Sequence, residues 1–197
     1  MAILVVGGST KDIGKTALVC AVIAALREFD WTAVKIAGHS YEPAESASSL
    51  SSYPSQTIWE ETIAGQDTDT ARYLAAGARR ALLVTRQGAE ISIDAIRATI
   101  AKDRNIIFES NQIIDAVEPD VCIALIGRDA TQMKPSFMPL LRKADALVGF
   151  DRIAIKSAEL PSGIPRFALQ SLDCLSPEMV KWLQSRFNRM QPPASRG

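Results

Sequence analysis

Histidine and cysteine are scarce in this sequence, and neither sign of charge is in excess. Its 197 residues include one histidine and three cysteines that lie far apart, so no C-x-x-C pair or His/Cys cluster predicts a metal site. We expect the cysteines to lie in the core of a protein from a reducing compartment. Lys plus Arg and Asp plus Glu both number 22, so composition gives no argument for a nucleic-acid partner or an anionic membrane.

Long hydrophobic runs are absent as well. The apolar run at residues 17–26, "ALVCAVIAAL", is far shorter than the roughly 20 residues that span a bilayer. The opening "MAILVVGG" has no basic leader of the kind that begins a secretory signal. We therefore expect a soluble cytoplasmic protein with neither a membrane nor a nucleic-acid partner.

The sequence is rich in short apolar segments that alternate with helical ones. Continuous apolar runs predict buried strands at 2–6, 31–37, 80–85, 105–110, 120–127, 145–150 and 165–170. Helices are predicted at 14–29, 69–78, 92–101, 135–144 and 176–190, the last with Ser176 as N-cap. This alternation predicts the α/β class, with a doubly wound, mostly parallel sheet and helices on both faces.

Residues 40–63 interrupt the alternation. Their first part, "SYEPAESASSLSSYPSQ", is rich in serine, proline and alanine and has little periodicity, which predicts a loop or flap. Two interpretations stay open, a disordered insertion or a segment that covers a substrate. We expect a single domain over residues 1–190 and a disordered tail at 191–197.

A glycine-rich stretch, "GGSTKDIGKT", lies between the first strand and the first helix. It ends like the phosphate-binding loop G-x-x-x-x-G-K-S/T, but Ser9 stands where that pattern has its first glycine. A loop longer by one residue, which opens at Gly8, restores the pattern. Backbone N–H groups at a helix N-terminus together with a lysine predict phosphate binding. The predicted nucleotide-binding residues are Gly8, Ser9, Thr10, Lys11, Asp12, Ile13, Gly14, Lys15, Thr16 and Ala17.

Two further stretches end predicted strands with polar side chains. "NIIFE" ends in Glu109, as does the second acidic motif of nucleotide hydrolases, whose acid binds Mg²⁺ directly or through water. A solvated or N-capping glutamate is the alternative. Lys35 lies inside an apolar strand, where it needs an anion or must extend to solvent. It is a candidate second cation for a phosphate, or a lysine at a strand edge.

These stretches all follow the carboxyl ends of predicted strands, where ligands bind in open α/β sheets, so one site could collect them. Lys15, Lys35 and Glu109 are the candidate catalytic residues. Lys15 would reach the terminal phosphates. The candidate Mg²⁺ ligands are Thr16, Asp69 and Glu109. Asp67 and Asp69 are alternatives for the acid near the metal, and either could instead cap the following helix.

Five other residues have open roles. His39 could touch substrate, act as an acid or base, or be structural. Asn111 and Gln112 could orient water or substrate, or make a turn. Lys134 and Lys156 lie late in the chain, where base-recognition loops could sit, but neither belongs to the guanine motif N-K-x-D. The base is therefore undetermined, and no Ser-His-Asp or Cys-His arrangement stands out.

Three successive segments resemble the molybdopterin-guanine dinucleotide biosynthesis protein B (MobB) family. They are "VVGGSTKDIGKTALV", "AVKIAGHS" and "TDTARYLAAGARRALLV", and the resemblance covers roughly residues 2–126. The residues that match the family's motifs are Lys35, Asp69, Thr70, Arg72, Ala76, Gly77, Ala78 and Glu109. The sequence departs from the family where a histidine-rich stretch is reduced to His39 and where "ESNQ" replaces Glu-Gly-Phe-Lys. The resemblance implies a P-loop protein that binds GTP and Mg²⁺, hydrolyses GTP slowly, forms a homodimer and assists molybdenum cofactor assembly with a partner enzyme.

The loop itself is similar to that of dethiobiotin synthetase, Gly-Thr-Asp-Thr-x-Val-Gly-Lys-Thr, which "GSTKDIGKT" matches in length. "VKIAG" also resembles that enzyme's Lys-Pro-Val-Ala-x-Gly, whose lysine helps to activate a substrate amine. The glycine-rich segment after the enzyme's acid is replaced here by "SNQII". This second resemblance implies an ATP-dependent ligase or kinase acting on a small acidic substrate. A nucleotide-regulated binding protein without significant turnover, which recruits a partner through residues 40–63, is a third hypothesis.

Overall fold

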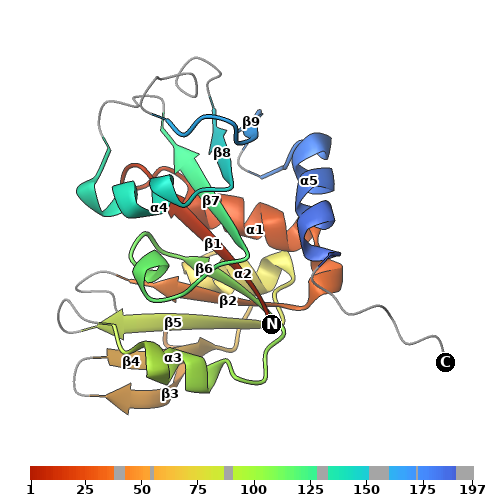
Figure 1. Ribbon diagram of the computed structural model, residues 1–197. Helices are drawn as coiled ribbons and strands as arrows, with labels where there is room; N and C mark the ends of the chain where they lie inside the picture. The colour runs from red at the N-terminus through yellow and green to blue at the C-terminus, as the bar shows by residue number, and fades with distance from the viewer. Residues whose placement is uncertain are drawn as a thin grey trace.

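A mostly parallel sheet organises the molecule (Figure 1). The computed structural model describes residues 1–37, 43–53, 56–86, 91–127, 133–150, 160–171 and 173–189. Within them the sheet has nine strands in the order β3-β4-β5-β2-β6-β1-β7-β8-β9. The strands are β1 (Ala2–Gly8), β2 (Trp31–Ile36), β3 (Ala47–Tyr53), β4 (Gln56–Glu61), β5 (Arg80–Arg86), β6 (Asn105–Glu109), β7 (Val121–Ile126), β8 (Ala146–Gly149) and β9 (Arg166–Ala168).

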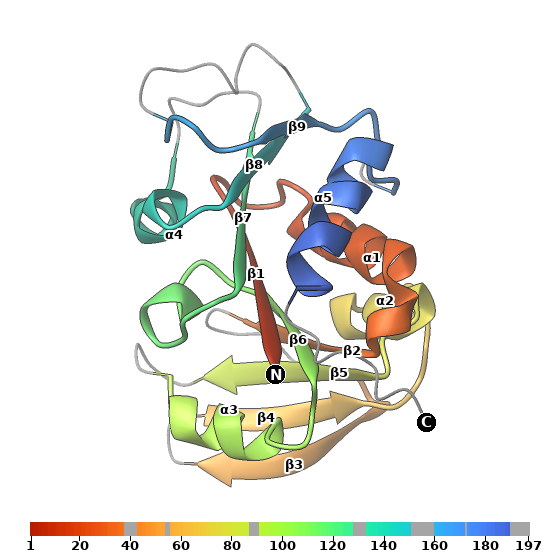
Figure 2. The ribbon, with the colours of Figure 1, turned by 45° about the vertical axis from the view of Figure 1, so that its right-hand side comes forward.

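Helices cover both faces of this sheet. They are α1 (Lys15–Ala25), α2 (Asp69–Ala76), α3 (Ile93–Thr99), α4 (Met138–Arg142) and α5 (Pro177–Phe187), with short 3-10 turns η1 (Arg27–Phe29), η2 (Ile113–Asp115) and η3 (Pro135–Phe137). Helices α1, α2 and α5 lie on one side and α3 and α4 on the other (Figure 2). The doubly wound α/β fold predicted from the alternation of strands and helices is confirmed.

The alternation of side chains along β1 explains the two layers of core. Val6 lies in a buried cluster with Leu18 of α1 and Tyr73 of α2. Val5 points the other way, into a cluster with Ile96 of α3 and Leu140 of α4. Because successive side chains of a strand point to opposite faces, a continuous apolar run fits a strand that is covered on both sides.

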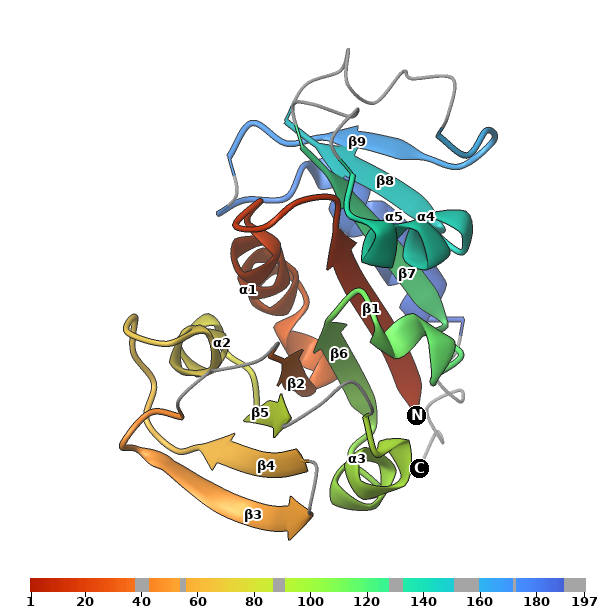
Figure 3. The same ribbon diagram turned by 90° about the vertical axis from the view of Figure 1, so that its left-hand side faces the viewer.

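The prediction of a loop or flap at residues 40–63 is wrong for much of that segment. Residues 47–53 and 56–61 form the strands β3 and β4, which pair antiparallel with each other, and β4 pairs antiparallel with β5 (Figure 3). Strand β3 is an edge strand with mostly exposed side chains, so its pairing needs no apolar periodicity. Backbone pairing, which composition does not report, therefore decides the structure of this serine-rich segment.

The structure also tests the predictions for the cysteines and for the N-cap of the last helix. Cys122 is buried, but Cys174 is exposed, so the expectation that all cysteines lie in the core is wrong. Ser176 caps α5 as predicted, because its hydroxyl accepts a hydrogen bond from the N–H of Met179. None of the helices in the described ranges has the length and apolar character needed to cross a bilayer.

Candidate functional site

The loop between β1 and α1 is shaped by two of its glycines. Gly14, the N-cap of α1, has a φ of 101°, a left-handed conformation that side-chain-bearing residues rarely adopt. At Gly8, a Cβ atom would lie 2.7 Å from Cγ2 of Ile13 and 2.9 Å from Cγ of Lys15. The missing side chain of Gly8 thus lets the stem of Lys15 fold back over the loop.

Ser9 has a structural role at the position where the usual pattern has glycine. The residue is fully buried, and its N–H donates to the carbonyl of Leu125 at 2.9 Å. Its hydroxyl accepts from the N–H of Gly127 at 2.9 Å, and its carbonyl accepts from the N–H of Lys134 at 2.9 Å. Ser9 therefore joins the loop to the end of β7 and to the segment that leads into η3.

Asn111 braces the start of the same loop. Its side-chain oxygen accepts from the N–H of Gly8 at 2.8 Å, and its side-chain nitrogen donates to the carbonyl of Gly8 at 3.0 Å. The N–H groups of Gly8 and Ser9 are therefore engaged within the protein. The first N–H groups of α1, at Lys15, Thr16 and Ala17, have no partner inside the helix by its geometry, as at every helix N-terminus.

Lys35 and Glu109 are brought together by strand register. They are aligned across the parallel pair of β2 and β6, and Glu109 is also aligned with Val6 of β1. Lys35 Nζ lies 3.3 Å from Glu109 Oε1 and also forms an ion pair with Asp69. Strand β2 lies between β5 and β6, so the alternative of a lysine at a strand edge is wrong.

Glu109 gathers hydrogen bonds from three other elements. The Thr16 hydroxyl of α1 donates to Glu109 Oε2 at 2.7 Å, and the Tyr73 hydroxyl of α2 donates to the same oxygen. Lys35 of β2 donates to the other oxygen. Only 5% of Glu109 is exposed, so the alternative of a solvated glutamate is wrong. We call Thr16, Lys35, Asp69, Tyr73 and Glu109 the Glu109 network.

The network combines Asp69 with a residue that the sequence analysis missed. Thr68 is the N-cap of α2, and its hydroxyl accepts from the N–H of Ala71, so the capping alternative for Asp67 and Asp69 is wrong. A tyrosine inside a helix usually serves the core, and Tyr73 is fully buried. The signal that could have found it is its position four residues after Asp69, which places both on one face of α2.

The surroundings of the network shift the pKa values of two of its side chains, Lys35 and Tyr73, and of Lys15, which lies nearby in the loop. Burial lowers the pKa of Lys35, but the charges of Glu109 and Asp69 and their hydrogen bonds outweigh burial and raise it above its usual value. Burial and the charge of Glu109 raise the pKa of Tyr73 well above its usual range. The pKa of Lys15 is lowered by burial and by the charges of Lys134 and Lys35, against an opposing effect of Glu109. Lys35 is therefore held charged, and the Tyr73 hydroxyl keeps its proton.

The oxygen atoms of the network could supply some of the ligands of a hard divalent cation, but not all of them. The Thr16 hydroxyl and the carboxylates of Glu109 and Asp69 are oxygen donors of the kind that Mg²⁺ takes. Across the described residues, no group of three His, Cys, Asp or Glu side chains is placed to hold a metal by itself. Mg²⁺ bound here would complete its coordination with phosphate oxygens and water, as it does in phosphoryl-transfer sites.

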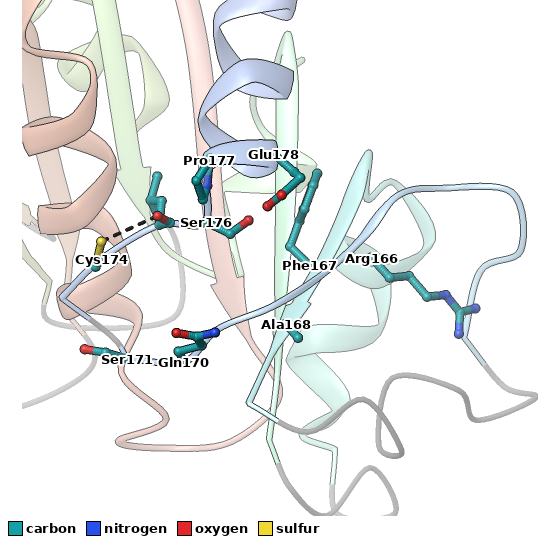
Figure 4. A pocket seen from close by; sticks show the side chains of 10 residues that line it. Arg166, Phe167, Ala168, Gln170, Ser171, Cys174, Ser176, Pro177 and Glu178 are labelled. Carbon is teal, nitrogen blue, oxygen red and sulfur yellow. Dashed lines mark hydrogen bonds between the residues drawn. The ribbon is translucent and has the colours of Figure 1, made fainter.

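A pocket of about 790 Å³ lies between the end of β9 and the start of α5 (Figure 4). Its lining includes Phe167, Gln170, Ser171 and Glu178, whereas Arg166 extends away from the other labelled side chains in this view. Strands β1, β7, β8 and β9 are parallel neighbours, so their carboxyl ends share one edge of the sheet. Three strand spacings place the end of β9 about 14 Å from that of β1.

The predicted nucleotide-binding residues 8–17 and the candidate residues Lys35, Asp69 and Glu109 all lie in the described ranges. Lys15, Thr16, Lys35, Asp69 and Glu109 come together at the carboxyl ends of β1, β2 and β6. His39 and Lys156 lie outside the described residues. The ligand roles of these side chains stay predictions.

The sequence matches no protein-family model and no curated protein. Solved structures do match. The MobB protein homologue of Bacillus stearothermophilus aligns over 96% of this chain and 99% of its own, with 18% identity and a TM-score of 0.51. HypB of Helicobacter pylori, solved in complex with nickel, aligns over 98% of this chain and 91% of its own, with 14% identity and a TM-score of 0.50.

LpxK of Aquifex aeolicus, solved in complex with ATP, aligns over 85% of this chain but 53% of its own, with 18% identity and a TM-score of 0.50. This chain thus spans about half of LpxK. At these identities the likenesses show the fold alone, an α/β fold that this chain shares with the MobB homologue, HypB and LpxK. The resemblance to MobB is confirmed at the level of that fold.

Proposed function

We propose that this chain binds a nucleoside triphosphate together with Mg²⁺ and hydrolyses it slowly. The observation that carries the proposal is the Glu109 network, in which Thr16 at the start of α1, Lys35 of β2 and Asp69 of α2 converge beside the loop at 7–16. These segments are distant in sequence, and together they supply cations, a hydroxyl and carboxylates at the N-terminus of a helix. This combination matches the needs of a bound polyphosphate and its metal.

In this proposal each group has a separate task. Lys15 and the N–H groups of residues 10–17 bind the phosphates, and Lys15 reaches the β- and γ-phosphates. Thr16 would ligate Mg²⁺, and Glu109 and Asp69 would help to hold it through water. The bound metal would neutralise charge on the phosphate oxygens. In hydrolysis, water attacks the γ-phosphorus, the bond to the bridging β–γ oxygen breaks, and a nucleoside diphosphate, inorganic phosphate and a proton are released.

Lys35 links the phosphate site to a second ligand. Its charge is balanced by Asp69 and Glu109, and Glu109 would be shared with the metal once Mg²⁺ is bound. Lys35 would then hold the terminal phosphate or an acidic second ligand. Both tasks use the ammonium group at the carboxyl end of β2.

The pocket at the end of β9 is the candidate site for the base. The base is attached to the phosphates through the ribose, and the pocket lies at the same edge of the sheet as the loop. Phe167 offers an aromatic surface, and Gln170 and Glu178 offer hydrogen-bonding groups. GTP is favoured by the resemblance to MobB, and ATP by the resemblance of the loop to dethiobiotin synthetase.

We propose further that the protein assists molybdenum cofactor biosynthesis, in particular the assembly of molybdopterin guanine dinucleotide. It would act in the cytoplasm as a homodimer with a cofactor-assembly enzyme as partner. Support comes from the MobB-like segments of the sequence and from the alignment over nearly the full length of the Bacillus stearothermophilus structure. The partner and the homodimer follow from that resemblance.

Two other functions are each favoured by a specific observation. An ATP-dependent ligase or kinase that acts on a small acidic substrate is favoured by the length of the loop and by the position of the Lys35 ammonium group at the end of β2. A nucleotide-regulated binding protein without significant turnover is favoured by the hairpin of β3 and β4. There Leu50 and Tyr53 are both 43% exposed and available to a partner.

Calorimetric titration with non-hydrolysable GTP and ATP analogues, with and without Mg²⁺, tests the proposal. Tight Mg²⁺-dependent GTP binding with weak ATP binding supports the MobB-like function, and preference for ATP supports the ligase or kinase. Binding without phosphate release from the natural nucleotide supports the regulated binding protein. If neither nucleotide binds, the proposal is wrong.

A further inference from the structure

The connection that follows β7 is tied to the phosphate loop at both of its described ends. Gly127 donates its N–H to the Ser9 hydroxyl, and Lys134 donates its N–H to the Ser9 carbonyl, each at 2.9 Å. Ser9 is fully buried, so both contacts are made inside the fold. The backbone of Lys134 is thereby fixed against the second residue of the loop. The sequence placed Lys134 among loops that could recognise the base, whereas the structure places its backbone at the phosphate loop.

Among the residues that the structure describes, no carboxylate balances the charge of Lys134. The Lys134 side chain is exposed, and across the described residues no carboxylate forms an ion pair with it or with Lys15. The positive charge of Lys134 is one of the influences that lower the pKa of Lys15, behind burial. Lys35 differs, because Asp69 and Glu109 balance its charge. Lys15 lies in the field of Glu109 and Asp12, but Lys134 adds a cation without an ion-pair partner among the described residues, which favours the binding of an anion beside the loop.

We propose that Lys134 binds the terminal phosphate of the bound nucleotide and is a third cation of the site besides Lys15 and Lys35. The inference rests on the proposed function. In a P-loop the lysine before the Ser/Thr reaches the β- and γ-phosphates, and the backbone of Lys134 is held against Ser9 of the same loop that carries this lysine, Lys15. The group that both cations can reach is therefore the γ-phosphate. The carbonyl of Ser9 holds the backbone of Lys134, and its hydroxyl holds Gly127 at the other described end of the same connection.

The test compares Lys134→Met with a matched control, Lys102→Met. Methionine keeps the aliphatic stem and removes the charge, and the hydrogen bond to Ser9 survives because it uses the backbone N–H. Lys102 is an exposed lysine in the turn after α3. Dissociation constants are measured by calorimetry for a non-hydrolysable triphosphate and for the diphosphate of the preferred base, both with Mg²⁺.

We expect Lys134→Met to weaken triphosphate binding by about tenfold and diphosphate binding much less, since one charge-assisted contact to the terminal phosphate is lost. Lys134→Arg should recover most of the affinity, and Lys102→Met should match the wild type. Equal losses for both nucleotides, or no loss beyond the control, would overturn the inference. If Lys15→Ala abolishes binding while Lys134→Met has no effect, the inference fails but the proposed function stands. If the wild type binds no nucleotide, both fail.

Discussion

Two buried glutamates end strands of the same sheet, but their hydrogen-bond donors come from different parts of the chain. Glu61 ends β4 and is 3% exposed, and Glu109 ends β6 and is 5% exposed. Among the described residues, Glu61 accepts only from hydroxyls and backbone N–H groups no more than 15 residues away in the chain. Glu109 accepts from Thr16, Tyr73 and Lys35, which lie 93, 36 and 74 residues away.

The direction of the strands explains this difference. Strand β4 runs antiparallel to β5, so Glu61 is aligned with Ala81 near the start of β5. Glu109 ends a parallel strand and is aligned with Lys35 and Val6, near the ends of β2 and β1. Burial and hydrogen bonding are shared by both glutamates. What distinguishes a candidate site is the convergence of charged groups from distant segments at the carboxyl edge of the parallel strands.

The largest effect on stability should come from Lys35→Met. The change leaves Glu109 and Asp69 without their shared cation, and removal of one partner from a buried ion pair typically costs roughly 3 kcal/mol. Unfolding in denaturant measures the loss. Lys102→Met, which changes an exposed lysine, should leave the free energy of unfolding nearly unchanged. A loss as small as that of the control would mean that Lys35 contributes nothing to the network.

Glu61→Gln should destabilise the protein by about 2 kcal/mol without changing nucleotide affinity, because it disturbs several buried hydrogen bonds away from the loop. Burial raises the pKa of Glu61, but the hydrogen bonds from Ser46, Ile63 and Thr62 outweigh burial and lower it below its usual 4.5. A lowered pKa in the folded state stabilises the protein fully above the unfolded-state value.

The stabilisation by Glu61 should therefore be complete above pH 4.5 and be lost as the pH falls through the lower folded-state pKa. Denaturant titrations of the wild type and Glu61→Gln at neutral and acidic pH should show a difference in stability that shrinks toward acid. A difference in stability that grows toward acid, or a change in nucleotide affinity at neutral pH, would contradict the view that Glu61 is a purely structural residue, unlike Glu109.

Glu109→Gln should have the opposite profile. Loss of the carboxylate charge should reduce the gain in nucleotide affinity from Mg²⁺ by about tenfold and lower turnover, with less effect on binding in the absence of metal. Titrations at several Mg²⁺ concentrations, with parallel assays of phosphate release, measure both effects. Wild-type Mg²⁺ response and turnover in this variant would remove Glu109 from the metal site.

Tyr73→Phe should have the smallest effect of the series, about 1 kcal/mol of stability, because Glu109 keeps its bonds from Thr16 and Lys35. Tyr53→Phe is the matched control, since Tyr53 is 43% exposed on β3. Thermal unfolding of the two variants measures the difference. Identical stabilities would show that the Tyr73 hydroxyl contributes nothing to the position of Glu109.

The elements of the site that sequence alone indicated are those set by local patterns. A buried strand that ends in an acid, as in 105–109, and a glycine-lysine-threonine turn before a helix each report their own position in a parallel sheet. Because parallel strands end at one edge, Lys35 and Glu109 could be expected to meet, and their alignment across β2 and β6 fits that reasoning. The Thr68 cap and the edge-strand pairing of β3 were not foreseen.

The remaining features depend on long-range packing that leaves little trace in local sequence. The Tyr73 hydroxyl reaches Glu109 only because α2 packs over β2 and α1. The contacts of Ser9 with Gly127 and Lys134 join residues more than 100 positions apart. Strand β3 is defined by its pairing with β4, not by apolar periodicity. A single sequence specifies these contacts through the whole fold, so a motif cannot reveal them.

The most direct test of the account is calorimetric titration of the wild type, Lys15→Ala and Glu61→Gln with the preferred triphosphate analogue and Mg²⁺. Loss of the charge-assisted bonds of Lys15, each contributing roughly 1.5–3 kcal/mol, should weaken binding by more than tenfold while the fold stays intact. Glu61→Gln should bind as the wild type does. Equal affinity of Lys15→Ala and the wild type would contradict the placement of a nucleotide at this loop.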